Sequence, residues 1–309
     1  MKCIMCKRDK ENLSEEHVFP DAIGGTLVLF NVCKDCNDIL GHSVDHHLTN
    51  HWLIQYQRSL LKIPGKSGTI PSPFKGGVIK KTEQKVRLTS DDEGRVKGYL
   101  MPSIKKEKNS DNTFEIEAVF DKQDKEKIPK MMDKILKRQG LGATYSEIDK
   151  KIIEGNLLEP ININIELDQV KYKKAIMKIV YELAHYWLGE NYFNDPIGEK
   201  IRKYIKSNDF SDDIAGSIGL FRKEEKKLLN LWEDEPLYHM AFMQKSGKNI
   251  IIYIKIFNVF DGSVILSNNA DCYHDFEPKF ISINPVTGIK RESNIYEEIV
   301  RRRKKNERD

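Results

Sequence analysis

The sequence contains no hydrophobic run long enough to cross a membrane. The stretch Ile250–Ile256 is apolar but short, and it includes Tyr253 and Lys255, whereas a membrane-spanning helix needs about 18 consecutive apolar residues or more. Residues 3–10 are mostly polar and already belong to the cysteine motif, so no secretory signal peptide is expected at the N-terminus. These features predict a soluble, cytoplasmic protein that has no membrane partner.

Cysteine is scarce, and its spacing is informative. Only five of the 309 residues are cysteine: Cys3 and Cys6 form one Cys-x2-Cys pair, Cys33 and Cys36 form a second, and Cys272 stands alone. In a reducing compartment such pairs are typical of metal ligands rather than of disulfides. Four thiolates are sufficient to bind one Zn²⁺ ion in tetrahedral geometry. The two pairs therefore predict a structural zinc site.

The chain also lacks the strong positive charge of a dedicated nucleic-acid-binding protein. Its 51 Lys and Arg residues are nearly balanced by 47 Asp and Glu residues, which gives a net charge of +4. The distribution is uneven, however, because twelve basic and five acidic residues lie between Lys62 and Lys108, and a second basic block spans Arg301–Lys305. Either segment is suited to contact phosphate groups, and either is equally compatible with a solvated surface.

The order of the expected elements predicts an α+β protein with two domains. Residues 1–61 combine the cysteine pairs with a strand at 26–32 and with helices between 36 and 61, where Ser43 is expected to start the second helix. Residues 62–77, rich in Pro, Gly, Ser and Lys, predict a linker. Residues 78–309 predict a larger mixed domain. Its expected elements are strands within 78–121 and at 160–167, helices at 124–138, 172–188 and 212–220, and an antiparallel meander over 237–267.

Three residues near the cysteine pairs have the chemistry that phosphodiester hydrolysis requires. Hydrolysis needs a base that activates water and a cation that takes up charge on the phosphoryl oxygens. The imidazole of His17 suits the base, because it titrates near neutral pH. Glu16 and Asn37 offer oxygen ligands to Mg²⁺, which keeps several waters and therefore needs few protein ligands. Neighbouring side chains of an extended segment point in opposite directions, so Glu16 and His17 are expected to serve the metal and the water separately.

The motifs at 16–20 (EHVFP), 24–25 (GG) and 32–41 (VCKDCNDILG) resemble the HNH endonucleases. The resemblance is to the branch that has two Cys-x2-Cys pairs and a Cys-Asn sequence in place of the final His, and it covers residues 3–48. It implies a ββα-metal fold, a structural Zn²⁺, one catalytic Mg²⁺ or Mn²⁺, and products with 5′-phosphate and 3′-hydroxyl ends. By motif position it implies that His17 is the base and that Glu16 and Asn37 bind the catalytic ion. Asp45, two helical turns after Asn37, is a further candidate ligand.

Two positions depart from the family pattern. The motif has a Glu-His pair where many HNH enzymes have Asp-His, and the longer side chain of Glu16 shifts the expected metal position. The middle Asn of the family pattern has no clear counterpart. Asn31 is the nearest candidate, but it lies closer to Cys33 than the pattern requires.

The sequence therefore predicts a metal-dependent endonuclease that acts on nucleic acid, with DNA as the favoured substrate. A single HNH site cuts one strand, so cutting both strands would call for a homodimer. Two alternatives stay open: a non-catalytic zinc ribbon that binds nucleic acid, and a partner-binding protein with a vestigial HNH unit. Residues 78–309 contain no motif that assigns them a role.

Overall fold

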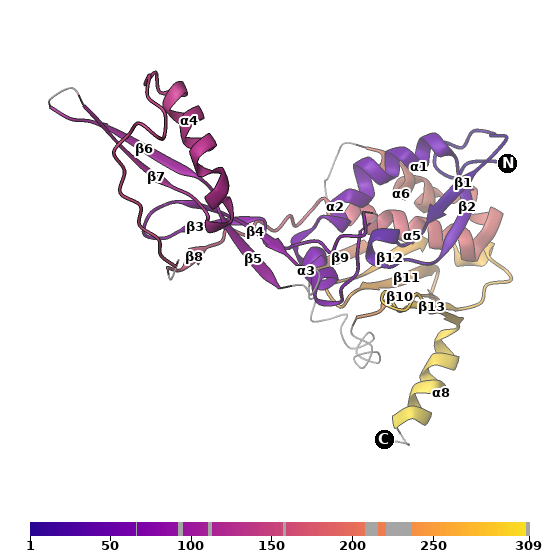
Figure 1. Ribbon diagram of the computed structural model, residues 1–309. Coiled ribbons are helices and arrows are strands. Elements are labelled where there is room, and N and C mark those ends of the chain that lie inside the picture. Colours follow the sequence, from indigo (N-terminus) through magenta and orange to yellow (C-terminus); the bar gives the residue numbers. More distant parts are fainter. Residues whose placement is uncertain are drawn as a thin grey trace. The chain divides into compact units, whose positions relative to one another are not determined.

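The computed structural model describes residues 1–65, 67–91, 95–110, 113–156, 159–207, 216–220 and 237–306 (Figure 1). The chain forms two compact units, the first comprising Met1–Pro73 and Glu166–Asp309 and the second comprising Phe74–Ile165. The second unit is therefore inserted into the chain of the first. This grouping differs from the expected domains 1–61 and 78–309, because the buried helix at 172–188 packs against the N-terminal motif.

A two-stranded ribbon followed by a helix forms the N-terminal motif. Strand β1 (Ser14–His17) pairs antiparallel with β2 (Val28–Val32), and helix α1 (Lys34–Leu40) follows directly. The turn between the strands contains the 3-10 helix η1 (Asp21–Ile23), and it closes at Gly24, whose φ of +83° is the left-handed conformation that favours glycine. The predicted ββα arrangement is confirmed.

Helix α1 continues without a break into a π-helical turn, η2 (Gly41–Asp45), and then into α2 (His46–Thr49). The expected helix start at Ser43 is wrong. Gly41 keeps right-handed helical torsion angles (φ −59°, ψ −43°), and the Ser43 hydroxyl donates to the carbonyl of Ile39 at 2.6 Å. The break comes later, where His51 caps helix α3 (Trp52–Leu60) by accepting a hydrogen bond from the amide of Leu53.

A long buried helix, α5 (Tyr172–Leu188), forms the middle layer of the first unit. It contacts α2 and η2 on one side and the sheet strand β12 (Phe260–Ser267) on the other. Every residue from Lys174 to Ala184 is buried, as expected for a helix enclosed between two layers. Gly189 ends α5 as predicted, and η4 (Gly189–Asn194) leads into α6 (Pro196–Lys206), which packs beside it. No helix in the described part of the chain is long and apolar enough to cross a bilayer.

The third layer is a six-stranded antiparallel sheet with the order β14-β13-β10-β11-β12-β9. The predicted meander is confirmed as β10 (His239–Ser246), β11 (Asn249–Ile256) and β12, and it is flanked by β13 (Lys279–Ile283), β14 (Lys290–Ser293) and β9 (Gly216–Leu220). The helix expected at 212–220 is wrong for residues 216–220, whose backbone pairs with β12, while 212–215 lie outside the described residues.

The two faces of this sheet belong to different hydrophobic clusters. The short 3-10 helix η6 (Ala270–Cys272) follows β12. Alternate residues of β11, such as Ile252 and Ile254, join the core shared with α5 and the N-terminal motif. On the opposite face, Phe242 and Phe280 pack against Ile295 of the C-terminal helix α8 (Ile295–Asn306). The N-terminal motif, α5 and one face of the sheet therefore share a single core.

The second unit contains a four-stranded antiparallel sheet with the order β5-β4-β3-β8. Its strands are β3 (Gly76–Ile79), β4 (Lys85–Ser90), β5 (Val96–Leu100) and β8 (Ile161–Asn162). A separate hairpin, β6 (Ser103–Lys108) and β7 (Phe114–Val119), precedes η3 (Lys122–Lys127) and α4 (Ile128–Arg138). The helix expected at 124–138 is confirmed, whereas the strand expected at 160–167 is limited to two residues, because β3 pairs only with those two.

Candidate active site

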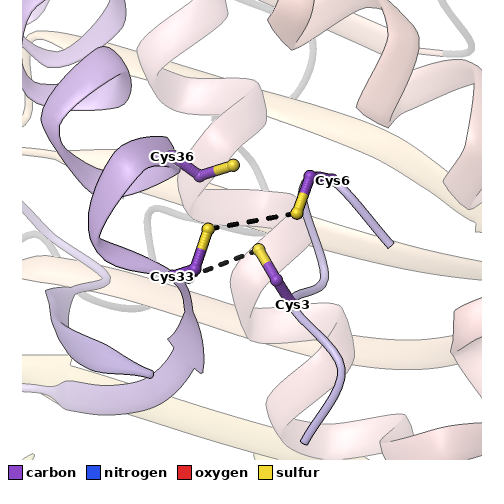
Figure 2. Close-up of side chains that lie close together, drawn as sticks. All are labelled: Cys3, Cys6, Cys33 and Cys36. Atoms are coloured by element: carbon purple, nitrogen blue, oxygen red, sulfur yellow. Dashed lines mark hydrogen bonds between the residues drawn. The ribbon is translucent and has the colours of Figure 1, made fainter. Parts of the chain in front are cut away.

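The four paired cysteines converge beside the ribbon and helix of the N-terminal motif (Figure 2). Their Sγ atoms all lie within 4.8 Å of one another, and the Sγ atoms of Cys6 and Cys33 are 3.9 Å apart. In a tetrahedral site with Zn–S bonds of about 2.3 Å, the sulfur atoms are about 3.8 Å apart. The cluster therefore fits one structural Zn²⁺. It is the only group of three or more His, Cys, Asp and Glu side chains with such spacing among the described residues.

The backbone around the first cysteine pair is shaped for metal binding. Lys7 has a φ of +58°, and its amide donates to the carbonyl of Cys3 at 2.8 Å, which closes the tight turn between Cys3 and Cys6. The amide of Cys33 donates to the Sγ atom of Cys3 at 3.3 Å. Burial acts to raise the pKa of Cys6, but hydrogen bonds from the backbone of Arg8 and from neighbouring thiols lower it to about 7. A thiol with a lowered pKa favours the thiolate, which is the form that binds metal.

His17 lies at the end of β1 and is partly exposed. Its ring atom Nδ1 is 3.2 Å from the carbonyl oxygen of Gly25. Because a carbonyl oxygen only accepts hydrogen bonds, Nδ1 is the donor in this contact, and in the neutral imidazole Nε2 then keeps its lone pair. That tautomer is the one a general base requires. The sequence had not predicted the role of the Gly25 carbonyl, and the only signal for it was the Gly24-Gly25 pair.

Glu16 points away from His17 into the interior of the first unit, where it is 3% exposed. Its Oε1 atom forms an ion pair with Nζ of Lys178 on α5, and Asp45 Oδ2 lies 3.1 Å from the same Nζ atom. Burial raises the pKa of both carboxyl groups, and the positive charge of Lys178 opposes that effect. The structure therefore brings Glu16 and Asp45 together, with a lysine between them.

Asn37, the third residue expected at the catalytic metal, lies on α1 and faces β1. Its Nδ2 group donates to the hydroxyl of Ser14 at 3.1 Å and to the carbonyl of Glu15, which ties the helix to the strand. Within the described residues, no hydrogen bond joins Asn37 to Glu16 or His17. Nor does any such bond join Asn31 to His17 in the described part of the chain, where the Oδ1 atom of Asn31 is buried and has no hydrogen-bond partner.

Two charged residues of α5 reach this site although the sequence had not predicted them there. Lys178 and Glu182 are both fully buried, one helical turn apart, with Lys178 Nζ 3.6 Å from Glu182 Oε2. Burial raises the pKa of Glu182 far above its ordinary range. Burial also acts to lower the pKa of Lys178, but the surrounding carboxylates overcome it and raise that pKa above its usual range. The sequence signal was a Lys-Glu pair at i, i+4 within the stretch 175–184, which contains no other charged residue.

The N-terminal motif matches one known family. Residues 3–53 match the model of a family described as HNH endonuclease. This range contains the cysteine cluster, β1, β2, α1 and α2, together with His17 and Asn37. No curated protein and no solved structure matches the chain. The family is one of nucleases, and residues 3–53 of this chain form a domain of the HNH type.

Proposed function

We propose that the protein is a metal-dependent endonuclease that hydrolyses phosphodiester bonds in nucleic acid, with DNA as the favoured substrate. The observation that carries the proposal is the state of His17 within the HNH domain. Its Nδ1–H is held by the carbonyl of Gly25, which leaves the Nε2 lone pair at a partly exposed position in the same ββα motif as the zinc-type cysteine cluster. An imidazole held in this way is prepared to accept a proton.

In the proposed reaction, Nε2 of His17 removes a proton from the water that attacks the phosphorus atom. A Mg²⁺ or Mn²⁺ ion, when bound, supplies positive charge at the phosphoryl and leaving oxygens. Glu16 and Asn37 are the proposed ligands, and Asp45 is a third candidate. The ion pair with Lys178 is made by Oε1 of Glu16, so Oε2 is the atom proposed for the ion. Asn37 uses Nδ2 for its hydrogen bonds, which leaves Oδ1 for the same purpose.

The decisive experiment compares His17→Ala with His42→Ala in plasmid relaxation with Mg²⁺, Mn²⁺ or EDTA. His42 is an exposed histidine of the same domain and is therefore a matched control. We expect metal-dependent relaxation by the wild type and by His42→Ala, and a rate at least about 100-fold lower for His17→Ala, as for loss of a general base. Zinc content should be equal in all three proteins. Equal cleavage by His17→Ala would refute the proposed base.

The second candidate function is a non-catalytic nucleic-acid-binding module. The pairing of Glu16 with Lys178 favours it, because a carboxylate that already has a cation partner is a weaker ligand for a second cation. This alternative predicts that the wild type retards DNA in a gel but gives no metal-dependent cleavage. The same assay therefore separates the two functions.

The assay also reports on the homodimer expected for double-strand cutting. Linear plasmid DNA at early times requires that both strands are cut, so it would indicate two cooperating copies of the chain.

A further inference from the structure

The side chain of Lys178 has an environment that no neighbouring lysine shares. It is fully buried, and its Nζ atom has four oxygen neighbours. Three are the carboxylates of Glu16, Asp45 and Glu182, and the fourth is the main-chain carbonyl of His17, which accepts a hydrogen bond at 2.9 Å. An ammonium group has three protons, so the bonds to His17, Glu16 and Asp45 use all of them.

The contact with the His17 carbonyl differs in kind from the three ion pairs. A carboxylate needs a counter-charge when it is buried, but a main-chain carbonyl needs only a donor. β1 belongs to a ribbon of only two strands, in which His17 pairs with Val28 and the amide of Val18 donates to the carbonyl of Leu27 at 3.0 Å. Lys178 supplies, from helix α5, a second bond to the same peptide group, at the carbonyl of His17.

Two contacts together define where the imidazole lies. The carbonyl of Gly25 holds the ring at Nδ1 (3.2 Å), and Lys178 holds the main chain of the same residue at its carbonyl (2.9 Å). The first contact sets the tautomer and the ring orientation, and the second sets the position of the backbone. A catalytic base needs both, because a displacement of about 1 Å is enough to lower a reaction rate by about 100-fold.

We infer that Lys178 is a positioning residue of the HNH site. From helix α5, which lies outside the HNH domain, Lys178 fixes the main chain of His17 and the carboxylate of Glu16 relative to each other. This inference rests on the proposed nuclease function for its kinetic consequence, but its structural consequence is independent of any activity. A role limited to neutralising buried carboxylates would require no contact with the His17 carbonyl.

The test compares Lys178→Met with Lys174→Met in the full-length protein. Lys174 lies one turn earlier on the same helix and is also buried, but its Nζ atom donates to the carbonyl of Ser207 at the end of α6. Both substitutions remove a buried ammonium from α5, so a general loss of stability affects both. Zinc content and thermal unfolding are measured for each variant. Cleavage kinetics and the NMR signals of the His17 imidazole and of the Val18 amide are then compared.

We expect Lys178→Met to shift the His17 and Val18 signals and to lower kcat by at least about 100-fold with little change in KM. Lys174→Met should keep the signals and stay within about threefold of the wild-type rate. Unmoved His17 and Val18 signals in Lys178→Met would overturn the inference, as would cleavage equal to that of Lys174→Met. If the wild type does not cleave, the proposed function fails, while the NMR comparison still decides the role of Lys178.

A second pair of variants applies if Lys178→Met does not fold. The double variant K178M/D45N removes one positive and one negative charge together, which reduces the cost of leaving buried carboxylates without a cation. It is compared with D45N alone, so that the remaining difference reports Lys178. Because Asp45 is itself a candidate metal ligand, the NMR comparison decides this pair: K178M/D45N should shift the His17 and Val18 signals relative to D45N, and unmoved signals would overturn the inference.

Discussion

Main-chain carbonyl groups determine much of the geometry around His17. The carbonyl of Gly25 contacts the ring, and the carbonyl of Ile23 accepts a hydrogen bond from Nε2 of His239 at 2.8 Å, which anchors the turn between β1 and β2. Side chains at these positions affect the site only through the path of the backbone. Substitutions that alter the backbone are therefore expected to affect the site more than substitutions that alter side chains alone.

Gly25→Ala is expected to lower both stability and cleavage. A Cβ atom at this position would lie 1.8 Å from the carbonyl oxygen of Phe19, so the turn must move and the carbonyl that holds His17 moves with it. Gly41→Ala is the matched control, because Gly41 has helical torsion angles and, apart from its chain neighbours and the backbone of its own helix, no atom lies within 4 Å of the place its Cβ atom would take. We expect Gly41→Ala to stabilise the protein by about 0.5–1 kcal/mol. Urea unfolding that ranks the two variants in the opposite order would contradict this account.

The lowered pKa of His239 leads us to expect that the folded protein loses stability on acidification. Burial lowers its pKa to about 4, although the hydrogen bond to the Ile23 carbonyl acts in the opposite direction. The unfolded chain, with a histidine pKa of about 6.5, binds a proton between about pH 6.5 and pH 4 that the native state does not. The contribution to stability is therefore complete above about pH 6.5 and is lost as the pH falls towards 4, by up to about 3 kcal/mol.

The measurement is urea unfolding at pH 6.5 and pH 4.5 for His239→Gln, which keeps a hydrogen-bond donor but does not titrate. The difference in stability between the two pH values should be smaller than in the wild type. His274→Gln, at an exposed position, should behave as the wild type does. An unchanged pH dependence in His239→Gln would show that His239 is not the titrating group.

At the scale of elements, β4 is the part of the second unit best suited to contact a polyanion. Its buried face contributes Val86 and Leu88 to the small core, while Lys85 and Arg87 alternate with them on the exposed face. The guanidinium of Arg87 lies over the ring of Tyr99 on β5, 4.9 Å from the centroid, which holds it in an extended position. The strand thus presents two positive charges on one surface.

Reversing both charges, as K85E/R87E, should weaken binding to DNA and make it less dependent on salt. If each side chain neutralises one phosphate, the slope of log K against log salt concentration should fall by about 2. K200E/K203E on α6 makes the same change in net charge at exposed positions and is the control. Equal slopes in both double variants would indicate a general charge effect and no contact at β4.

At the scale of the whole molecule, the HNH domain depends on parts of the chain far from it in sequence. The hydroxyl of Tyr181 donates to the carbonyl of Ile4 at 3.0 Å, and Arg202 donates to that of Met5 at 2.7 Å. Both carbonyls belong to the loop that carries Cys3 and Cys6. Helices α5 and α6 therefore hold the first half of the zinc-type cluster as well as the base.

A fragment of residues 1–73 is expected not to fold, even with zinc present. Its buried apolar residues share one core with α5 and the sheet, so the isolated fragment would expose that surface to water. The control is a chain in which a flexible Gly-Ser linker replaces residues 74–165, which form their own compact unit. We expect the control to show a cooperative thermal transition. A dispersed NMR spectrum of the 1–73 fragment would contradict the dependence.

The sequence was sufficient to predict the parts of the site that are local in the chain. Cys3, Cys6, Cys33 and Cys36 cluster as their spacing predicts, and the strand, turn, strand and helix follow in the expected order. The roles of His17 and Asn37 as base and ligand stay predictions. The contact of Lys178 with His17 could not be predicted, because the two residues lie 161 positions apart and a single sequence does not identify a partner at that distance. The packing of residues 166–309 with the N-terminal motif could not be predicted for the same reason, because it depends on contacts between residues far apart in the sequence.

The insertion of the second unit has a consequence for synthesis on the ribosome. The cysteine loop and His17 emerge first, but Lys178 follows His17 by 161 positions, and all of residues 74–165 come between them. At roughly 5–20 residues per second, translation needs on the order of ten seconds to cover that stretch. During this interval the nascent chain lacks the helix that encloses its nuclease motif. A cell that makes this protein therefore completes the surroundings of His17 only after residues 74–165 and helix α5 have been translated.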